Sequence, residues 1–115
     1  MEPTTNLPDV PGAILAYQQA HDRRDVDTAL AQFAAEAVVA DDGRTYAGLD
    51  EIRHFLSSAA SEYTYTRTLL SAVEEGEGAW LLTNRLEGNF PGGTVDLSYR
   101  FRMSGDQIAG LDIAP

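Results

Sequence analysis

The hydrophobic pattern of the chain changes once, near Ser61, from a period of about 3.6 residues to a period of 2. Apolar residues recur at helical spacing before this point, and they alternate with polar residues after it. Helices followed by a run of long strands are typical of the α+β class. A length of 115 residues corresponds to one domain. We therefore expect a flexible, proline-bearing arm over residues 1–8 and one α+β domain over residues 9–115.

Three helices and a short hairpin are predicted before the change. The first helix starts near Asp9, and Asp25 is a good N-cap for the second. The turn sequence Asp41-Asp42-Gly43 closes a hairpin, and Gly48 opens the third helix. The expected core positions are Val10, Ala13, Ile14, Tyr17 and His21 in the first helix, Val26, Leu30, Phe33 and Ala37 in the second, and Leu49, Ile52, Phe55, Leu56 and Ala59 in the third.

Four long strands are predicted after the change, over residues 63–73, 79–88, 94–103 and 107–113. Successive side chains of a strand point to opposite faces, so the apolar face has to point inward. By this rule Asp96 and the arginines of the third of these strands point outward. The polar side chains expected inside the domain are Tyr17, His21, Asp41, Asn84 and Tyr99.

The composition excludes several kinds of chemistry. All eight basic residues are arginine and there is no cysteine, so a lysine Schiff base, a thiolate nucleophile and a thiolate metal site are excluded. Two histidines are too few for a histidine-built metal centre, and we expect neither a metal nor a cofactor. The net charge of −10 disfavours nucleic acid and anionic membranes as partners. The remaining groups for chemistry are carboxylates, hydroxyls and imidazoles.

No stretch of the chain approaches the roughly 20 consecutive apolar residues of a membrane span. Residues 1–12 have neither the basic segment nor the apolar segment of a secretory signal. A cytoplasmic location is therefore the expectation.

Four groups of residues carry a resemblance to a known family. They are Ala16-Tyr17 with Asp25, Phe33-Ala34 with Ala37-Val38-Val39, Gly48-Leu49-Asp50-Glu51-Ile52 with Phe55, and Tyr99-Arg100-Phe101-Arg102 with Ile108. Together they resemble the SnoaL-like domains of the nuclear transport factor 2-like superfamily. The resemblance implies a cone-shaped domain, in which three N-terminal helices pack on a strongly curved mixed or antiparallel sheet around a pocket for a hydrophobic small molecule. It also implies a homodimer formed through the sheet.

This superfamily includes ketosteroid isomerases, polyketide cyclases, scytalone dehydratase, limonene-type epoxide hydrolases and proteins without catalysis, so the fold does not fix the function. In ketosteroid isomerases a tyrosine of the first helix stabilises an oxyanion, and an aspartate of the first hairpin is the base. The resemblance places Tyr17 and Asp41 in these roles. The second oxyanion acid of those enzymes has no counterpart, because the inward positions on the corresponding strand are Leu97 and Tyr99.

The residues themselves allow two interpretations of each candidate. Apolar surroundings would raise the pKa of Asp41 above its usual value of about 3.9 and make it a better general base, or Asp41 only forms the turn. The phenol of Tyr17 would donate to an oxyanion, or it is an ordinary core tyrosine. His21 lies on the same helix face as Tyr17 and either exchanges protons with a substrate or bonds to a backbone carbonyl.

Other polar residues are expected at the surface. His54 forms an i,i+3 pair with Glu51, but no partner motif completes a di-metal site. Epoxide hydrolases of the superfamily need an aspartate–arginine–aspartate set inside the cone. The outward positions of Arg85, Arg100 and Arg102 argue against that reaction.

Two hypotheses follow. In the first, a cofactor-independent enzyme of the isomerase or cyclase type acts on a hydrophobic, carbonyl-bearing molecule that resembles a steroid or polyketide. Asp41 removes a proton next to the carbonyl, and Tyr17 stabilises the enolate. In the second, the chain is a non-catalytic ligand-binding or dimerisation domain. The expected substrate-binding residues are His21, Phe33, Phe55, Trp80, Asn84 and Tyr99, and the sequence leaves open whether His21, Asp96 or Asp112 takes part.

Overall fold

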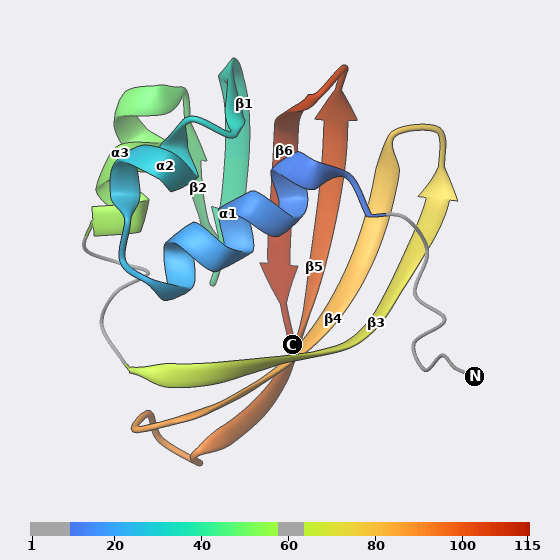
Figure 1. The fold of residues 1–115 in the computed structure, drawn as a ribbon. Helices are drawn as coiled ribbons and strands as arrows, with labels where there is room; N and C mark the ends of the chain where they lie inside the picture. Colours follow the sequence, from blue (N-terminus) through green and yellow to red (C-terminus); the bar gives the residue numbers. More distant parts are fainter. Residues whose placement is uncertain (1–9, 58–63) are drawn as a thin grey trace.

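The structure is a computed structural model that describes residues 10–57 and 64–115 (Figure 1). Its three N-terminal helices and six strands confirm the predicted α+β class. The predicted arm, residues 1–8, and the predicted core residue Ala59 lie outside the described residues. The elements in chain order are α1 (Gly12–Asp22), α2 (Val26–Leu30), β1 (Phe33–Asp41), β2 (Arg44–Ala47), α3 (Leu49–Ser57), β3 (Tyr65–Gly76), β4 (Ala79–Gly88), β5 (Thr94–Ser104) and β6 (Gln107–Ala114).

The six strands form one mixed sheet in the order β2-β1-β6-β5-β4-β3. Strands β1 and β6 are parallel, and every other neighbouring pair is antiparallel. The last strand of the described chain therefore lies in the middle of the sheet, between the early hairpin and the later meander. Helix α1 crosses one face of this sheet (Figure 1).

The second helix is shorter than predicted. It ends at Leu30, and the predicted helical core residues Phe33 and Ala37 lie on β1. A spacing of four residues places two side chains on one face of either a helix or a strand, so this pair could not distinguish the two. Pairing with β6 decides the outcome, because Phe33 is in register with Ile108, whose N–H donates to the carbonyl of Gln32 at 2.8 Å. The predicted N-cap is confirmed, since Asp25 Oδ1 accepts from the Thr28 N–H at 3.2 Å.

The early hairpin is confirmed and closes on two residues. Asp42 and Gly43 have φ values of 53° and 78°, and the flanking residues Asp41 and Arg44 pair with each other. Positive φ at both central positions is the type I′ geometry that suits the twist of a hairpin. Asp41 is thus the last residue of a strand, and the turn itself is made by its two successors.

The core lies between α1 and the sheet, and the predicted alternation is observed on the central strands. On β4, Trp80, Leu82, Asn84 and Leu86 are buried, whereas Arg85 and Glu87 are exposed. On β5, Tyr99 and Phe101 are buried, and Asp96, Arg100 and Arg102 are exposed. Within residues 10–57 and 64–115, no helix has the length and apolar character needed to cross a membrane.

Candidate functional site

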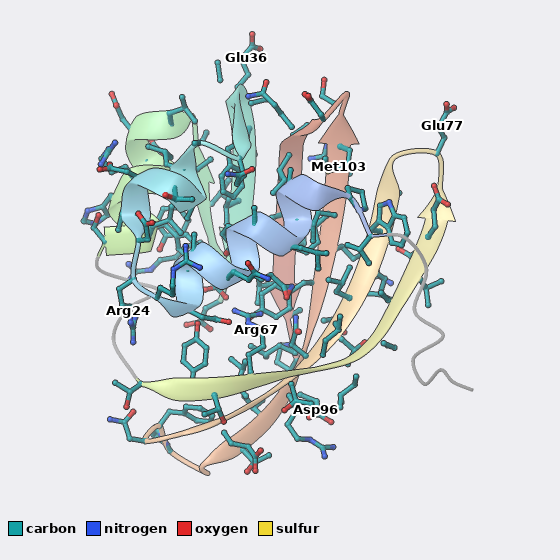
Figure 2. All side chains as sticks on the ribbon, in the orientation of Figure 1. Arg24, Glu36, Arg67, Glu77, Asp96 and Met103 are labelled. Carbon is teal, nitrogen blue, oxygen red and sulfur yellow. The ribbon has the colours of Figure 1, made fainter. Side chains whose placement is uncertain are left out.

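Seven polar and aromatic side chains of α1 and of strands β3, β4 and β5 lie in the same part of the interior. We call this group the interior polar cluster. Helix α1 contributes residues at its C-terminal end, and each of the three strands contributes residues from its inner face. Figure 2 shows Arg67, the cation of this cluster, between α1 and β3. The members are Tyr17, His21, Asp22, Tyr65, Arg67, Asn84 and Tyr99.

Arg67 is a buried cation, with only 6% of its side chain exposed. Its Nε donates to both carboxylate oxygens of Asp22, at 3.1 Å each. The guanidinium carbon lies 5.1 Å from the ring centroid of Tyr99 and 5.8 Å from that of Tyr65. Burial alone would lower the pKa of Arg67, but the acidic groups of Tyr99, Asp22 and Tyr65 outweigh it and raise the pKa. Arg67 therefore stays positively charged inside the domain.

Tyr65 completes the support of this cation. Its hydroxyl donates to Asp22 Oδ1 at 3.2 Å and accepts from Arg67 Nη2 at 3.5 Å. Burial raises the pKa of Tyr65 to about 12. The phenol is consequently neutral and holds the two charged groups in place.

Tyr17 is fully buried in the apolar part of the same region. Its ring meets Phe33 and Phe101 edge-on, with centroid distances of 5.3 Å and 6.0 Å, and it stacks on His21 at 5.9 Å. Burial, and then the neighbouring Tyr99, raise the pKa of Tyr17 well above its usual value of 10.0. Tyr17 is thus a protonated phenol, and its Oη has no hydrogen-bond partner among the described residues.

Asn84 is the most deeply buried polar side chain of the sheet, with 0% exposure. It stands opposite Leu69 of β3 and Leu97 of β5. Within the described part of the chain, neither its Nδ2 nor its Oδ1 has a hydrogen-bond partner, and the same holds for Arg67 Nη1. Native proteins satisfy nearly all buried polar atoms, so a cluster of exceptions calls for partners beyond the described residues.

His21 is buried at the C-terminal end of α1. Burial and the nearby charge of Arg67 lower the pKa of His21 to about 4. The imidazole is therefore neutral near pH 7, because its protonated form would be a buried cation next to Arg67.

Asp41 approaches this region from β1. It is half-buried on the strand face that carries the buried residues Ala37 and Val39. Burial, assisted by the neighbouring carboxylate of Asp42, raises the pKa of Asp41. The charge of Asp41 in turn raises the pKa of Tyr17 and of Tyr99, so its field reaches the interior polar cluster.

The other predicted residues fall into two groups. Phe33 and Trp80 are buried on the inner face of the sheet, at 2% and 6% exposure. Phe55 is also buried, but its ring packs on Tyr46 of β2 at a centroid distance of 4.9 Å, beside the hairpin. Asp96 pairs with Arg85 at 2.8 Å on the outer face (Figure 2), and Asp112 and His54 are exposed.

Sequence reasoning missed three members of the cluster, namely Asp22, Tyr65 and Arg67. The arginines of β4 and β5 are exposed on the outer face of the sheet, as predicted, but Arg67 of β3 is not. A usable signal lies in the threonines at 64, 66 and 68, which alternate along β3 and assign Tyr65 and Arg67 to the opposite face, with Leu69. The interior of the domain therefore does contain an arginine.

The described residues contain no group of three or more histidine, cysteine or acidic side chains placed to hold a metal ion. Glu51, considered with His54 as a fragment of a metal site, has a structural contact instead. Its Oε1 accepts from the Ala47 N–H at 2.7 Å, just before α3 begins. This contact stabilises the start of the helix in the manner of a capping box.

Comparisons with known proteins agree with this architecture. A family model described as the SnoaL-like domain matches residues 14–111. A protein from Sinorhizobium meliloti, described as a "putative polyketide cyclase", is 30% identical, and its structure superposes with a TM-score of 0.84 over 91% of this chain and 95% of its own. No curated protein matches the sequence significantly.

Two more distant structures share the fold and contain ligands of their own. A Catenulispora acidiphila protein with a ketosteroid isomerase-like fold, in complex with trimethylamine, is 18% identical with a TM-score of 0.79, covering 92% of this chain and 86% of its own. A Mycobacterium tuberculosis protein in complex with estradiol-17beta-hemisuccinate is 16% identical with a TM-score of 0.73, covering 88% of each chain.

Proposed function

Because the chain belongs to the family of SnoaL-like domains, we propose that it is a cofactor-independent acid–base enzyme of the isomerase or cyclase type. Its substrate is a hydrophobic, carbonyl-bearing small molecule that resembles a steroid or a polyketide. The observation that supports this most is a group of four buried polar atoms that have no hydrogen-bond partner among the described residues, namely Tyr17 Oη, Asn84 Nδ2 and Oδ1, and Arg67 Nη1. A fifth such atom, Gln18 Nε2, belongs to a residue outside the interior polar cluster. An unsatisfied buried polar group costs about 1–3 kcal/mol, so such a set is expected where a ligand is bound.

In the proposed reaction, Asp41 takes a proton from the carbon next to the substrate carbonyl. The C–H bond breaks, its electron pair forms the enolate, and negative charge develops on the carbonyl oxygen. Tyr17 donates its phenolic proton in a hydrogen bond to that oxygen, and its raised pKa keeps it protonated. In an isomerisation, Asp41 returns the proton to another carbon of the substrate. In a cyclisation, the enolate carbon instead forms a bond to the carbon of a second carbonyl of the same molecule. The π pair of that carbonyl moves to its oxygen, which takes the proton from Asp41.

The position of Asp41 supports its role as the base. Asp42 and Gly43 make the type I′ turn, so the hairpin does not require a carboxylate at position 41. The pKa of Asp41 is raised by burial, which brings its basicity closer to the range in which a general base is effective. Neutral His21, stacked on Tyr17, fixes the phenol ring in its orientation.

The relatives support the class of substrate. The Sinorhizobium meliloti protein is described as a polyketide cyclase candidate, and the Mycobacterium tuberculosis protein holds an estradiol derivative. In this chain Phe33, Trp80 and Tyr99 provide apolar inner-face surface that suits a fused-ring molecule.

A second candidate is a ligand-binding domain without turnover. Asn84 favours it, because an amide with both atoms unpartnered can donate to and accept from a ligand without any proton transfer. The two candidates differ in their dependence on Asp41, which only the enzyme needs. We also propose a cytoplasmic protein, with residues 9–115 as the functional domain, that forms a homodimer through the outer face of the sheet.

The test follows the step that isomerisation and cyclisation share. A β,γ-unsaturated ketosteroid and a bicyclic aromatic ketone are incubated in D₂O, and deuterium incorporation next to the carbonyl is followed by NMR. We expect Asp41→Asn to lower the rate at least about 100-fold and Tyr17→Phe to lower it about 10²- to 10³-fold. Asp42→Asn is the matched control, since asparagine tolerates the positive φ at this position. It removes only the lesser of the two causes that raise the pKa of Asp41, so it should lower the rate far less than Asp41→Asn.

Ligand binding is measured in the same samples. Equal ketone affinity in wild type and Asp41→Asn, with no deuterium incorporation in either, would establish the binding domain and reject the enzyme. Exchange that is unaffected by Asp41→Asn would reject Asp41 as the base.

A further inference from the structure

We propose that the hydrophobic ligand of this site carries an anionic oxygen group, and that Nη1 of Arg67 binds this group. The inference rests on the proposed function in so far as it names the class of ligand for the same interior site. It assigns to Arg67 a role in ligand selection that is separate from the proton transfer by Asp41.

The protein uses only some of the N–H donors of the Arg67 guanidinium. A guanidinium has five N–H groups and no acceptor. The Nε–H is used by Asp22, and Nη2 reaches the hydroxyl of Tyr65. Nη1 is buried and has no hydrogen-bond partner among the described residues. The Tyr99 hydroxyl also interacts with the guanidinium, since burial raises the pKa of Tyr99 and a hydrogen bond with Arg67 opposes this rise. The two N–H groups of Nη1 are nevertheless buried without an acceptor within residues 10–57 and 64–115.

The ion pair between Asp22 and Arg67 uses one nitrogen of the guanidinium. Arginine and a carboxylate frequently pair through two parallel hydrogen bonds that occupy two nitrogens of the fork. Here both oxygens of Asp22 converge on Nε alone, at 3.1 Å each. Asp22 therefore anchors one edge of the guanidinium and leaves the opposite end, with Nη1, for a second acceptor.

Further hydrogen-bond donors lie beside Arg67 on the neighbouring strands. Asn84 stands opposite Leu69 and Leu97, and Arg67 and Tyr99 each lie two residues from one of these on the same face. Arg67, Asn84 and Tyr99 are therefore diagonal neighbours on three adjacent strands. The Asn84 Nδ2 group adds further donors without a partner in the described chain. A surface this rich in donors selects an oxygen acceptor, and an anionic acceptor forms hydrogen bonds roughly twice as strong as a neutral one.

The sheet also separates this group from the proposed base. Asp41 is on β1, and β6, β5 and β4 lie between β1 and the Arg67 strand, β3. Tyr99 connects the two residues, because its ring lies 5.1 Å from the Arg67 guanidinium carbon and the charge of Asp41 raises its pKa. A ligand with its anionic oxygen at Arg67 can therefore extend past Tyr99 toward Asp41. A carboxylate and an ionised phenol or enol share this chemistry.

The test is an equilibrium binding experiment that requires no turnover. Binding of 2-naphthoate (a carboxylate), 2,4-dinitro-1-naphthol (an ionised phenol) and 2-naphthamide (neutral) to the full chain is measured by calorimetry at pH 7. We expect at least one anion to bind tenfold or more tightly than the amide, and the better anion identifies the source. The preference for the anion over the amide should fall to twofold or less in Arg67→Met. It should fall equally in the double variant Arg67→Met with Asp22→Asn, in which no unpaired carboxylate remains to repel the anion. Arg100→Met removes one exposed charge and should keep the preference.

A measurement on the wild type alone guards against variants that fail to fold. The guanidinium NMR signals of Arg67 should shift on addition of the better anion and not on addition of 2-naphthamide. The inference is overturned if no anion binds at millimolar concentration, if the amide binds as tightly as both anions, or if the preference survives in both Arg67 variants.

The outcome is distinguishable from that of the proposed function. Arg67-dependent anion binding without deuterium exchange supports the inference and rejects the enzyme. Exchange into neutral ketones without anion preference supports the enzyme and rejects the inference.

Discussion

The carboxylate of Asp22 accepts from Arg67 Nε through both of its oxygens, and this pair joins the C-terminal end of α1 to the edge strand β3. The two side chains are unequally buried, since Asp22 is 34% exposed and Arg67 only 6%. A charge that keeps contact with water tolerates the loss of its partner, whereas a buried charge does not. The stability of the domain should therefore depend on the carboxylate more than on the guanidinium.

We expect Asp22→Ala to lower the free energy of unfolding by about 3 kcal/mol or more, because it leaves the Arg67 charge buried and unpaired. Arg67→Met should cost less, about 1–2 kcal/mol, because Asp22 can be hydrated. Urea unfolding of both single variants and the double variant measures the coupling. The exposed pair of Arg53 and Asp27, at 2.9 Å, is the control and should show a coupling of about 0–1 kcal/mol. A larger loss in Arg67→Met than in Asp22→Ala would contradict this prediction.

The stability should also depend on the protonation of His21. Its pKa is about 4 in the folded protein and 6.5 in the unfolded chain, so the unfolded state binds more protons between these values. The contribution of His21 is present above pH 6.5 and is lost as the pH falls toward 4, by about 3 kcal/mol in total. His21→Gln should remove this part of the pH dependence of urea unfolding. A slope in His21→Gln identical to that of wild type would refute the assignment.

Replacing Asn84 by leucine should stabilise the domain and abolish ligand binding. Leucine has the same branching and the same number of side-chain heavy atoms as asparagine, and it removes two buried polar atoms that have no partner in the described chain, so a gain of about 1–3 kcal/mol is expected. Thermal and urea unfolding measure the gain. Asn89→Leu is the matched control with the opposite sign, because Asn89 Oδ1 accepts from the Thr64 N–H at 3.0 Å. Destabilisation in Asn84→Leu would show that the amide is satisfied within the fold.

Two glycines of the sheet should respond differently to alanine. A Cβ at Gly88 would overlap the carbonyl oxygen of Thr64 and the backbone of Tyr65, which cannot move without disturbing the pairing of β3 and β4. We expect Gly88→Ala to cost about 1–3 kcal/mol or more. The three heavy atoms nearest to a Cβ at Gly110 all belong to the guanidinium of Arg102, which can rotate away. Gly110→Ala should therefore cost less than about 1 kcal/mol, and equal losses in urea unfolding would contradict the distinction.

Much of the fold could be predicted from the hydrophobic periodicity, because the residues that the periodicity assigns to the interior are the ones that are buried. The strands at 79–88, 94–103 and 107–113 alternate cleanly, and the observed β4, β5 and β6 match them to within one residue. Prediction failed at Phe33 and Ala37, where a four-residue spacing fits a helix and a strand alike. Only the parallel pairing with β6, about 70 residues later in the chain, decides between the two, and no local pattern contains that information.

The candidate site was predicted in part for a similar reason. Tyr17, Asn84 and Tyr99 occupy apolar stripes, so their burial follows from the pattern. Arg67 was missed because an arginine among threonines is typical of a solvated strand. Its burial depends on Asp22 and Tyr65, which approach from other elements and satisfy part of its charge and donors. Whether such an arginine is buried depends on its tertiary neighbours. The alternation of threonines along β3 indicates only on which face of the strand Arg67 lies.

The central position of β6 has a consequence for how the protein is made. While residues 107–114 are still inside the ribosome, the β1–β2 hairpin and the β3–β5 meander have no strand to join them. The edges of β1 and β5 that pair with β6 in the folded domain then keep unpaired backbone groups until β6 emerges and inserts between them. The whole sheet is thus expected to form only after β6 has emerged. A nascent chain stalled before β6 should be the form most in need of a chaperone.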